Sequence, residues 1–542
     1  MSAQLVNLHV GHGCKPILEA IKQQAEEYCY ISPSYGSAPR GELAKMLVEL
    51  LPDNFGKVFF TNAGADANEN AIKIARMYTG RKKVFSRYRS YHGSTFGAGN
   101  LTGEPRRYPL EPGIPGFVKF FDPYIYREPI EFASEEEATN YYLAKLEEQI
   151  VYENPDDVAA IVMETVTGSN GVIIPPKGYL PGVRKICDKY GIVMICDEVM
   201  AGFGRTGKMF AFENFGVKPD LVSFAKGVTC GYVQLGGVAV SSKIAAYFDD
   251  HLLSCGLTYS GHPLACAAGI ACLNYYKDND ILGNVNRVGK VLGEELEKMK
   301  ANHACVGDVR YIGLFSSIEL VKDKATKEPW VVYGKDPEGK MGRVCKLLRE
   351  RRFMTYSHEN MIFISPPLII TEAQMREELA KVEEVLSILD KEIWAMQQFY
   401  MPVRVVEGAG CVRAAATLIA PLGKCALIVT GKSSKKNGSL DDVVVALEGN
   451  GQRYAVFDEV LPNPTIACVR AGAARAKEAG ADFVIAIGGG SPMDAAKAIA
   501  LLARQDIADA DLFAGRYSPD VLPMVHIPTT AGTGSEVTQY SI

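Results

Sequence analysis

Short apolar strands alternate with amphipathic helices over about residues 14–395, and this alternation restricts the chain to few architectures. The segments VAAIVMETV, GIVMICDEV and DLVSFAK read as short buried strands between glycine-rich turns. PGVRKICDKY lies between two of them and reads as a helix. Strand–helix alternation of this kind predicts an α/β fold, in which helices cover both faces of a mostly parallel sheet.

A long helical stretch, LNYYKDNDILGNVNRVGKVLGEELEKMKANH, follows these strands, and we expect it to break near Gly283. It leads to a smaller C-terminal subdomain that ends in EAQMREELAKVEEVLSILDKEIW. At about Met396 the strand–helix pattern restarts, with no Gly/Ser- or Pro-rich linker before it. Because a single domain has about 100–200 residues, we divide the chain into 1–275, 276–395 and 396–542.

Charge and hydropathy exclude several classes of function. The formal net charge of −5 gives no electrostatic basis for binding nucleic acid or an anionic membrane. No apolar run reaches the roughly 18–20 residues of a membrane-spanning helix, and the N-terminus lacks a secretory signal. The 13 cysteines include no C-x-x-C pair, and the eight histidines show no metal-binding spacing. We therefore expect a cytoplasmic protein with reduced thiols and no metal ion.

Two polar residues end buried strands of the first region, where open α/β sheets bind their ligands. Asp197 ends VMICD, and a buried carboxylate is costly unless a cation pairs with it. Lys226 follows LVSFA, and a desolvated lysine loses its proton more easily and can form a Schiff base. Each residue alone also fits a structural role. The order Asp197, GFGRTG, Lys226 favours a functional one.

The segment TNAGADANENAIKIAR places Ala63, Gly64 and Ala65 between a strand and a helix. Backbone N–H groups at such a helix N-terminus can hold a phosphate. A tight strand-to-helix turn without any ligand explains this motif equally well.

Together these residues resemble the class III aminotransferases, a branch of the fold type I pyridoxal-phosphate enzymes. The resemblance runs from residue 2 to about 395 and rests on DEVMAGFGRTG, PDLVSFAKG and LTYSGHPLACAAG. It implies a homodimer with active sites at the subunit interface, which acts on a small-molecule amino donor and a keto-acid acceptor. It implies that Lys226 forms a Schiff base with pyridoxal 5'-phosphate and carries the proton, and that Asp197 pairs with the pyridine nitrogen. The other implied cofactor-binding residues are Tyr91 and Val199 on the two ring faces, His92 next to Tyr91 in the sequence, and Gly64, Ala65 and the neighbouring subunit's Thr258 at the phosphate.

Two positions depart from the family pattern together. Many members that act on α-amino acids or 2-oxoglutarate carry a carboxylate-binding arginine where MIFISPPL has Phe363. The glutamate that pairs with this arginine is replaced by Ser169 in TGSNG. The paired loss indicates that another group binds the substrate acid. Arg89, Arg106 and Arg107 are candidates, although a surface or structural role explains each of them too.

Within the family, YHGSTFGAGNLTGEPRRYPLEPG and ETVTGSNG are most similar to the taurine aminotransferases. These enzymes transfer the ω-amino group of taurine to pyruvate or 2-oxoglutarate and leave sulfoacetaldehyde. We therefore expect an ω-amino acid donor, with taurine first and β-alanine or 4-aminobutyrate as alternatives. The family has a further N-terminal segment before S-Q-L-V-N that contributes to the substrate pocket. We expect it to be missing, because this chain starts at Met1.

The third region contains a strand, a glycine turn and a helix in FVIAIGGGSPMDAAKAIALLA. Its Gly488, Gly489, Gly490 and Ser491 can place backbone N–H groups against a pyrophosphate. With DEVLPNPT before it and IPTTAGTGSEVT after it, this region resembles the nucleotide-binding half of the iron-containing alcohol dehydrogenases.

This second resemblance implies a partial Rossmann-like domain in which Thr529 and Thr530 line a weakly held NAD or NADP. The metal ligands of that family lie beyond the last residue of this chain, so we expect no iron and no dehydrogenase activity. Two rival hypotheses stand beside the aminotransferase. One is a dehydrogenase whose aminotransferase region is inert, and the other is a non-catalytic cofactor-binding fragment.

Overall fold

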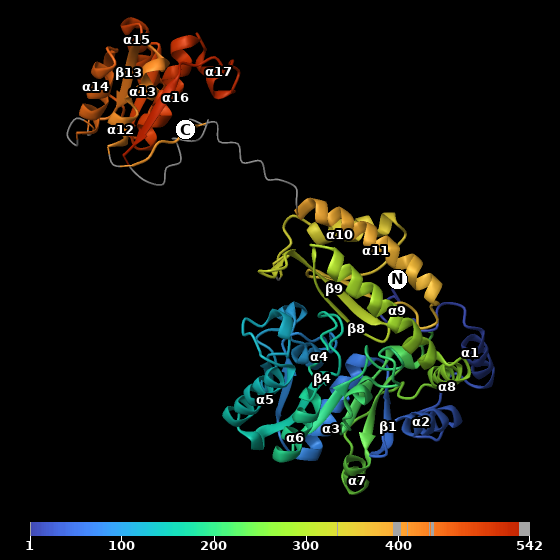
Figure 1. Cartoon of the computed structure of the whole chain (residues 1–542). Helices are drawn as coiled ribbons and strands as arrows, with labels where there is room; N and C mark the ends of the chain where they lie inside the picture. The colour runs from blue at the N-terminus through green and yellow to red at the C-terminus, as the bar shows by residue number, and fades with distance from the viewer. Residues whose placement is uncertain are drawn as a thin grey trace. The chain divides into compact units, whose positions relative to one another are not determined.

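The computed structural model describes residues 2–332, 334–393, 403–408, 410–432, 434 and 438–529. The chain forms two compact units, Met1–Ala395 and Met396–Ile542 (Figure 1). Among the described residues, the first unit contains two sheets and the second contains one, and each unit has its own apolar cores. In the described part of the chain, no helix combines the length and the apolar character that crossing a bilayer requires.

The first unit is built on a seven-stranded sheet with the strand order β1-β7-β6-β5-β4-β2-β3. Neighbouring strands from β6 to β3 are parallel, whereas β7 is antiparallel to both β6 and β1. The mostly parallel sheet predicted from the strand–helix alternation is therefore confirmed. Its strands are β1 Phe55–Thr61, β2 Lys83–Arg87, β3 Phe117–Phe120, β4 Val158–Glu164, β5 Val193–Asp197, β6 Leu221–Phe224 and β7 Gly236–Ser241.

Side chains of the central strands point alternately into two apolar cores, one on each face of the sheet. In β4 every residue is buried: Ala160 and Val162 join one core, and Ile161 and Met163 join the other. Burial on both faces explains why these strands read as continuous apolar runs. The first core also contains α3 (Gly64–Thr79) and α7 (Ser242–Asp250), and the second contains α5 (Glu135–Tyr152), α6 (Tyr179–Tyr190) and α8 (Pro263–Asp278).

A smaller antiparallel sheet follows the seven-stranded one and packs with long helices. Its order is β10-β9-β12-β11, and β8 also pairs with β9. The chain start joins it, because the N–H of Ala3 donates to the carbonyl of Ser365 at 2.8 Å. Its strands are β8 Val306–Ile312, β9 Phe315–Asp323, β10 Glu328–Pro329, β11 Ser357–His358 and β12 Met361–Ile364. The remaining helices of this unit are α1 Lys15–Glu27, α2 Ala38–Leu50, α4 Phe96–Leu101, α9 Ile281–Asn302, α10 Lys340–Glu350 and α11 Glu372–Ile393.

The long helical stretch breaks before Gly283, not at it. α8 ends at Asp278, and α9 begins at Ile281. Asp280 adopts a left-handed backbone with φ 44°, and its side chain accepts a hydrogen bond from the N–H of Gly283 at 3.2 Å. An N-cap carboxylate starts a helix at the next residue. The expected break near Gly283 is therefore confirmed, and the side chain of Asp280 sets its position.

The second unit has a four-stranded sheet with the order β14-β13-β15-β16, and all of its pairs are parallel. This sheet fits the partial Rossmann-like fold expected from the sequence. Its strands are β13 Cys425–Thr430, β14 Arg453–Phe457, β15 Phe483–Gly488 and β16 Met524–Pro528. Its helices are α12 Cys411–Ala414, α13 Ala416–Ile419, α14 Ser439–Gly449, α15 Ile466–Ala479, α16 Gly490–Arg504 and α17 Asp509–Phe513.

We expect a chain that ends at Ala395 to fold as the first unit does in the whole protein. The sheet of that unit and its apolar cores are made by its own residues. In differential scanning calorimetry, the shortened chain should keep one of the transitions of the full chain at the same temperature. Loss of cooperative unfolding in the shortened chain would contradict this expectation.

Candidate active site

The carboxyl ends of β5 and β6 meet the start of α3 at one edge of the seven-stranded sheet. Asp197 is the last residue of β5, and Lys226 follows β6 after a single intervening residue. Because β5 and β6 are parallel neighbours, both residues leave the sheet at the same edge. The charge of Asp197 is felt at Lys226, and Val199 lies against Gly64 at the start of α3. The structure thus brings the three separate sequence motifs together.

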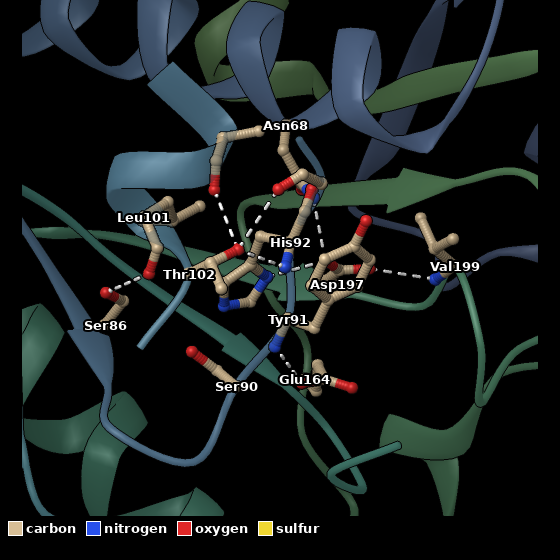
Figure 2. Close-up of polar contacts among 12 residues, drawn as sticks. Asn68, Ser86, Ser90, Tyr91, His92, Leu101, Thr102, Glu164, Asp197 and Val199 are labelled. Atoms are coloured by element: carbon tan, nitrogen blue, oxygen red, sulfur yellow. Dashed lines mark hydrogen bonds and ion pairs between the residues drawn. The ribbon is translucent and has the colours of Figure 1, made fainter. Parts of the chain in front are cut away.

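Three donors hold the buried carboxylate of Asp197 (Figure 2). Asn68 Nδ2 donates to Oδ2 at 2.8 Å, and His92 Nδ1 donates to the same oxygen at 2.7 Å. The backbone N–H of Val199 donates to Oδ1 at 3.0 Å. Asn68 also donates to the carbonyl of His92 at 2.9 Å, which ties the two donors to each other. A carboxylate held on both oxygens keeps one orientation.

His92 is itself fixed by the polypeptide around it. Its backbone N–H donates to Thr102 Oγ1 at 2.9 Å, and the Thr102 hydroxyl donates to the carbonyl of Ala98 at 3.0 Å (Figure 2). The ring is buried, and Nε2 has no hydrogen-bond partner among the described residues. Within this chain, His92 therefore contacts Asp197 directly and orients its carboxylate.

The side-chain amine of Lys226 is not engaged by a described residue and is available to react. Its Nζ makes no hydrogen bond or ion pair with any residue that the structure describes. Burial lowers the pKa of Lys226, the charge of Asp197 opposes that shift, and the charge of Arg106 adds to it. The backbone of Lys226 is left-handed, with φ 46°, which costs about 1–3 kcal/mol for a residue other than glycine. Strain of this kind is typical of a residue that the surrounding structure holds for function.

The N-terminus of α3 is free of side-chain caps. Its N-cap residue, Ala63, supplies none. A Cβ at Gly64 would lie 2.9 Å from both methyl groups of Val199, so any larger residue would displace that side chain. Ala65 lies beside Gly93, where an added Cβ would come within 2.5 Å of the Ala65 Cβ. The small residues therefore leave the first N–H groups of a 16-residue helix open to an anion.

Arg106 lies over the ring of Tyr91, with the guanidinium carbon 3.7 Å from the ring centroid. Nη2 donates to Ser169 Oγ at 3.1 Å, and Nε pairs with the buried carboxylate of Glu104. The side chain is half-exposed. Its contacts with Ser169, Glu104 and the ring of Tyr91 thus hold this guanidinium in place. It lies at the same site as Lys226, because the charge of Arg106 lowers the pKa of Lys226.

The other two candidate arginines are paired away from this site. Arg89 Nη1 lies 3.2 Å from the fully buried carboxylate of Asp122. Arg107 pairs with Glu111, one helical turn along the chain. Of the three arginines that the sequence could not separate, the structure brings only Arg106 onto Tyr91.

Sequence reasoning missed Glu164, the last residue of β4. Its buried carboxylate accepts from the N–H of Tyr91 at 3.0 Å (Figure 2). It also accepts from the N–H of Gly168 at 2.6 Å. Burial raises the pKa of this carboxyl group. Glu164 joins the Tyr91 loop to the turn that carries Ser169. An acid at the end of a buried strand was the signal used for Asp197, and it applied here as well.

Phe363 lies at the position where many class III members have a carboxylate-binding arginine. Its side chain has no charge with which to bind a substrate acid. Its side chain is fully buried in β12. Its ring stacks on Tyr356, with 4.2 Å between centroids and 11° between planes. Of the two departures noted in the sequence, Phe363 forms an apolar stack and Ser169 accepts a hydrogen bond from Arg106.

Thr258, predicted to act on the neighbouring subunit, accepts a hydrogen bond at its carbonyl from the Tyr30 hydroxyl at 3.0 Å. Its role across a subunit interface stays a prediction.

In the second unit, the predicted glycine turn lies between β15 and α16. Gly488 has φ +146°, and a Cβ there would lie 2.7 Å from Pro492 Cγ, so glycine is required. Gly489 is the N-cap of α16, with no side-chain cap. The N–H of Thr529 donates to the carbonyl of Gly488 at 2.8 Å, so the two predicted segments lie side by side. Thr530 lies outside the described residues.

Comparisons with known families agree with this division of the chain. The model of the family described as aminotransferase class-III matches residues 1–386. The model described as iron-containing alcohol dehydrogenase matches residues 402–542.

Individual relatives are similar over the first region. The taurine–pyruvate aminotransferase of Bilophila wadsworthia is 33% identical, over 72% of this chain and 88% of that protein. A diaminobutyrate–2-oxoglutarate transaminase of Halomonas elongata is 33% identical, over 71% of this chain and 85% of that protein. Among solved structures, the taurine:2-oxoglutarate aminotransferase of Bifidobacterium kashiwanohense, in complex with PLP and glutamate, is 53% identical. Its TM-score is 0.71, over 72% of this chain and 89% of that one.

We expect Asn68→Ala to lower the free energy of unfolding of the first unit by about 1–3 kcal/mol, because it removes a donor from a buried carboxylate. Asn70→Ala is the matched control. This neighbour in α3 donates only to the carbonyl of Asp66, at 2.8 Å. Urea denaturation followed by circular dichroism measures both variants. Equal losses would show that the contact with Asp197 contributes nothing specific.

Proposed function

The chain belongs to the class III aminotransferases over residues 1–386, and from this premise we propose that it transfers the ω-amino group of taurine to pyruvate or 2-oxoglutarate. The products are sulfoacetaldehyde and alanine or glutamate. The names of the Bilophila and Bifidobacterium relatives support taurine as the donor. The observation that carries the proposal is the position of Arg106, on Tyr91 and bonded to Ser169.

Class III aminotransferases use pyridoxal 5'-phosphate, and the residues at the sheet edge fit that group. Lys226 offers an amine with no partner among the described residues, and Asp197 offers a buried, oriented carboxylate for a protonated ring nitrogen. The uncapped start of α3 at Gly64 offers N–H groups for the phosphate. Tyr91 and Val199 are the residues proposed for the two ring faces. When bound, the cofactor supplies an electron sink for the bond broken at the amino-bearing carbon.

Lys226 has two roles in this proposal. Burial lowers the pKa of Lys226 and so favours its neutral amine, which is the nucleophile that holds a carbonyl group covalently. With the cofactor bound, the Lys226 amine would also be the group that carries the proton leaving the amino-bearing carbon of the donor. Asp197 keeps the ring nitrogen protonated, because Asn68 and His92 hold its charge in one place.

Arg106 is the proposed binding group for the acid of the donor. Glu104 takes its Nε, Ser169 accepts one N–H of Nη2, and Tyr91 covers one face of the guanidinium, so the remaining Nη donors are the ones proposed for the acid. A sulfonate or carboxylate accepts from these donors in a charge-assisted pair. The ring of Phe363 cannot supply such a contact. This difference favours an ω-amine with a distant acid over an α-amino acid.

The remaining parts of the proposal concern assembly and the second unit. We propose a homodimer, as the family implies, in which Thr258 reaches the partner's phosphate site. We also propose that the glycine turn at Gly488 binds a nicotinamide nucleotide weakly, because α16 begins there without a side-chain cap.

We expect Lys226→Ala to abolish taurine turnover and covalent capture of the cofactor. Borohydride reduction followed by peptide mass spectrometry should find pyridoxal phosphate on Lys226 in the wild type and on no residue in the variant. Lys208→Ala, which changes an exposed lysine in the same chain, is the control and should keep the adduct. A reducible adduct at the same yield in Lys226→Ala would disprove the assignment.

We expect Arg106→Ala to lower the second-order rate constant for the reaction with taurine by about 100-fold. This factor corresponds to the loss of about 3 kcal/mol from a charge-assisted contact. The reaction of the donor with the loaded enzyme, followed by stopped-flow absorbance without a keto acid, isolates donor binding. An uncharged amine, 1-phenylethylamine, should change little.

Arg107→Ala is the matched control, because this neighbour pairs with Glu111. It should leave both donors unaffected. If Arg106→Ala slowed taurine and 1-phenylethylamine equally, Arg106 would have a structural role and another residue would bind the acid.

A further inference from the structure

Tyr356 has a buried hydroxyl without a hydrogen-bond partner among the described residues. Leaving such a group unpaired in a folded protein is costly, and buried polar groups in native structures are nearly always paired. The backbone around it is well fixed, since the carbonyl of Tyr356 accepts from the N–H of Phe363 at 3.3 Å. The ring is clamped by its stack on Phe363. The hydroxyl therefore cannot turn away to find another partner.

This hydroxyl lies close to the charges of the candidate active site. Burial raises the pKa of Tyr356, the charge of Glu164 raises it further, and the charges of Arg106 and Arg205 oppose the shift. The group is therefore a neutral O–H donor throughout the working range of pH. Glu164 and Arg106 are the residues that frame Tyr91 and Ser169. Tyr356 comes directly before β11, whose His358 has Nε2 3.7 Å from the carboxylate of Glu104, the partner of Arg106.

The sulfonate of the proposed donor needs a hydrogen-bond donor besides the arginine. The Nη edge of one arginine offers two roughly parallel N–H donors, which match the two oxygens of a planar carboxylate. A sulfonate is tetrahedral, and its third oxygen lies out of that plane. Without a further donor, this oxygen would enter a partly buried site unpaired.

We propose that the Tyr356 hydroxyl donates to the acid group of the amino donor beside Arg106, and that it makes the site selective for a sulfonate over a carboxylate. This inference rests on the proposed function of the first unit. It assigns a specificity-determining role to a residue that the sequence motifs did not single out.

Tyr356→Phe tests the proposal, because it removes the hydroxyl and keeps the ring that stacks on Phe363. The donor reaction of the loaded full-length enzyme is measured by stopped-flow absorbance with taurine, β-alanine and 1-phenylethylamine. For taurine we expect the apparent dissociation constant to rise about 10-fold with the limiting rate nearly unchanged, as for one lost hydrogen bond to a charged group. The rise for β-alanine should be about 2-fold, and 1-phenylethylamine should be unaffected.

Tyr179→Phe is the matched control. Its hydroxyl is also buried without a partner in the described structure, but it belongs to α6. It should leave the ratio of taurine to β-alanine binding as in the wild type. A second measurement needs no turnover: without a donor, the melting temperature of Tyr356→Phe should equal or exceed that of the wild type, because an unpaired buried hydroxyl has been removed.

The outcomes distinguish failure of this proposal from failure of the proposed function on which it rests. Equal weakening of taurine and β-alanine, or no weakening, in an enzyme that depends on Arg106 for taurine would overturn only the role of Tyr356. Weakened binding of 1-phenylethylamine would show a structural role and overturn it as well. A wild-type enzyme that does not react with taurine would overturn both proposals.

Discussion

The buried carboxylate of Asp197 is the constraint on which the first unit depends. A negative charge at the end of an interior strand is tolerated only with donors on its oxygens. Here the donors come from α3, from the loop after β2 and from the turn after β5. Segments more than 100 residues apart in the sequence must therefore converge on one point. The seven-stranded sheet achieves this because parallel strands deliver their carboxyl ends to the same edge.

Features governed by neighbouring residues could be predicted from the sequence, and features governed by distant partners could not. Asp197 and Lys226 were found because strand ends can be read locally. The helix break was expected near Gly283, and the side chain of Asp280, which caps α9, sets its position. Glu164 was overlooked although it satisfied the criterion applied to Asp197. Its value became visible only when its two backbone donors were known.

The three arginines show most clearly what could not be predicted from the sequence. Arg89, Arg106 and Arg107 lie within 19 residues and look alike in the sequence. Their roles differ because the acids that neutralise them differ in position: Asp122 is fully buried and draws Arg89 away, and Glu111 holds Arg107 one turn along. The partner of Arg106, Glu104, takes only Nε. No local pattern encodes which edge of a guanidinium stays available.

The two sheets of the first unit contribute different residues to the candidate site. The seven-stranded sheet supplies the charged edge that any member of the family needs, whereas the hairpin of β11 and β12 brings Tyr356 and Phe363 against it. Phe363 packs in an apolar cluster with β9, so a charge at that position would be buried without a partner. The apolar stack therefore fits the absence of an arginine at this position. In the proposed function, residues outside the Asp197 network bind the acid group, so substrate class can vary while the buried carboxylate and its donors stay the same.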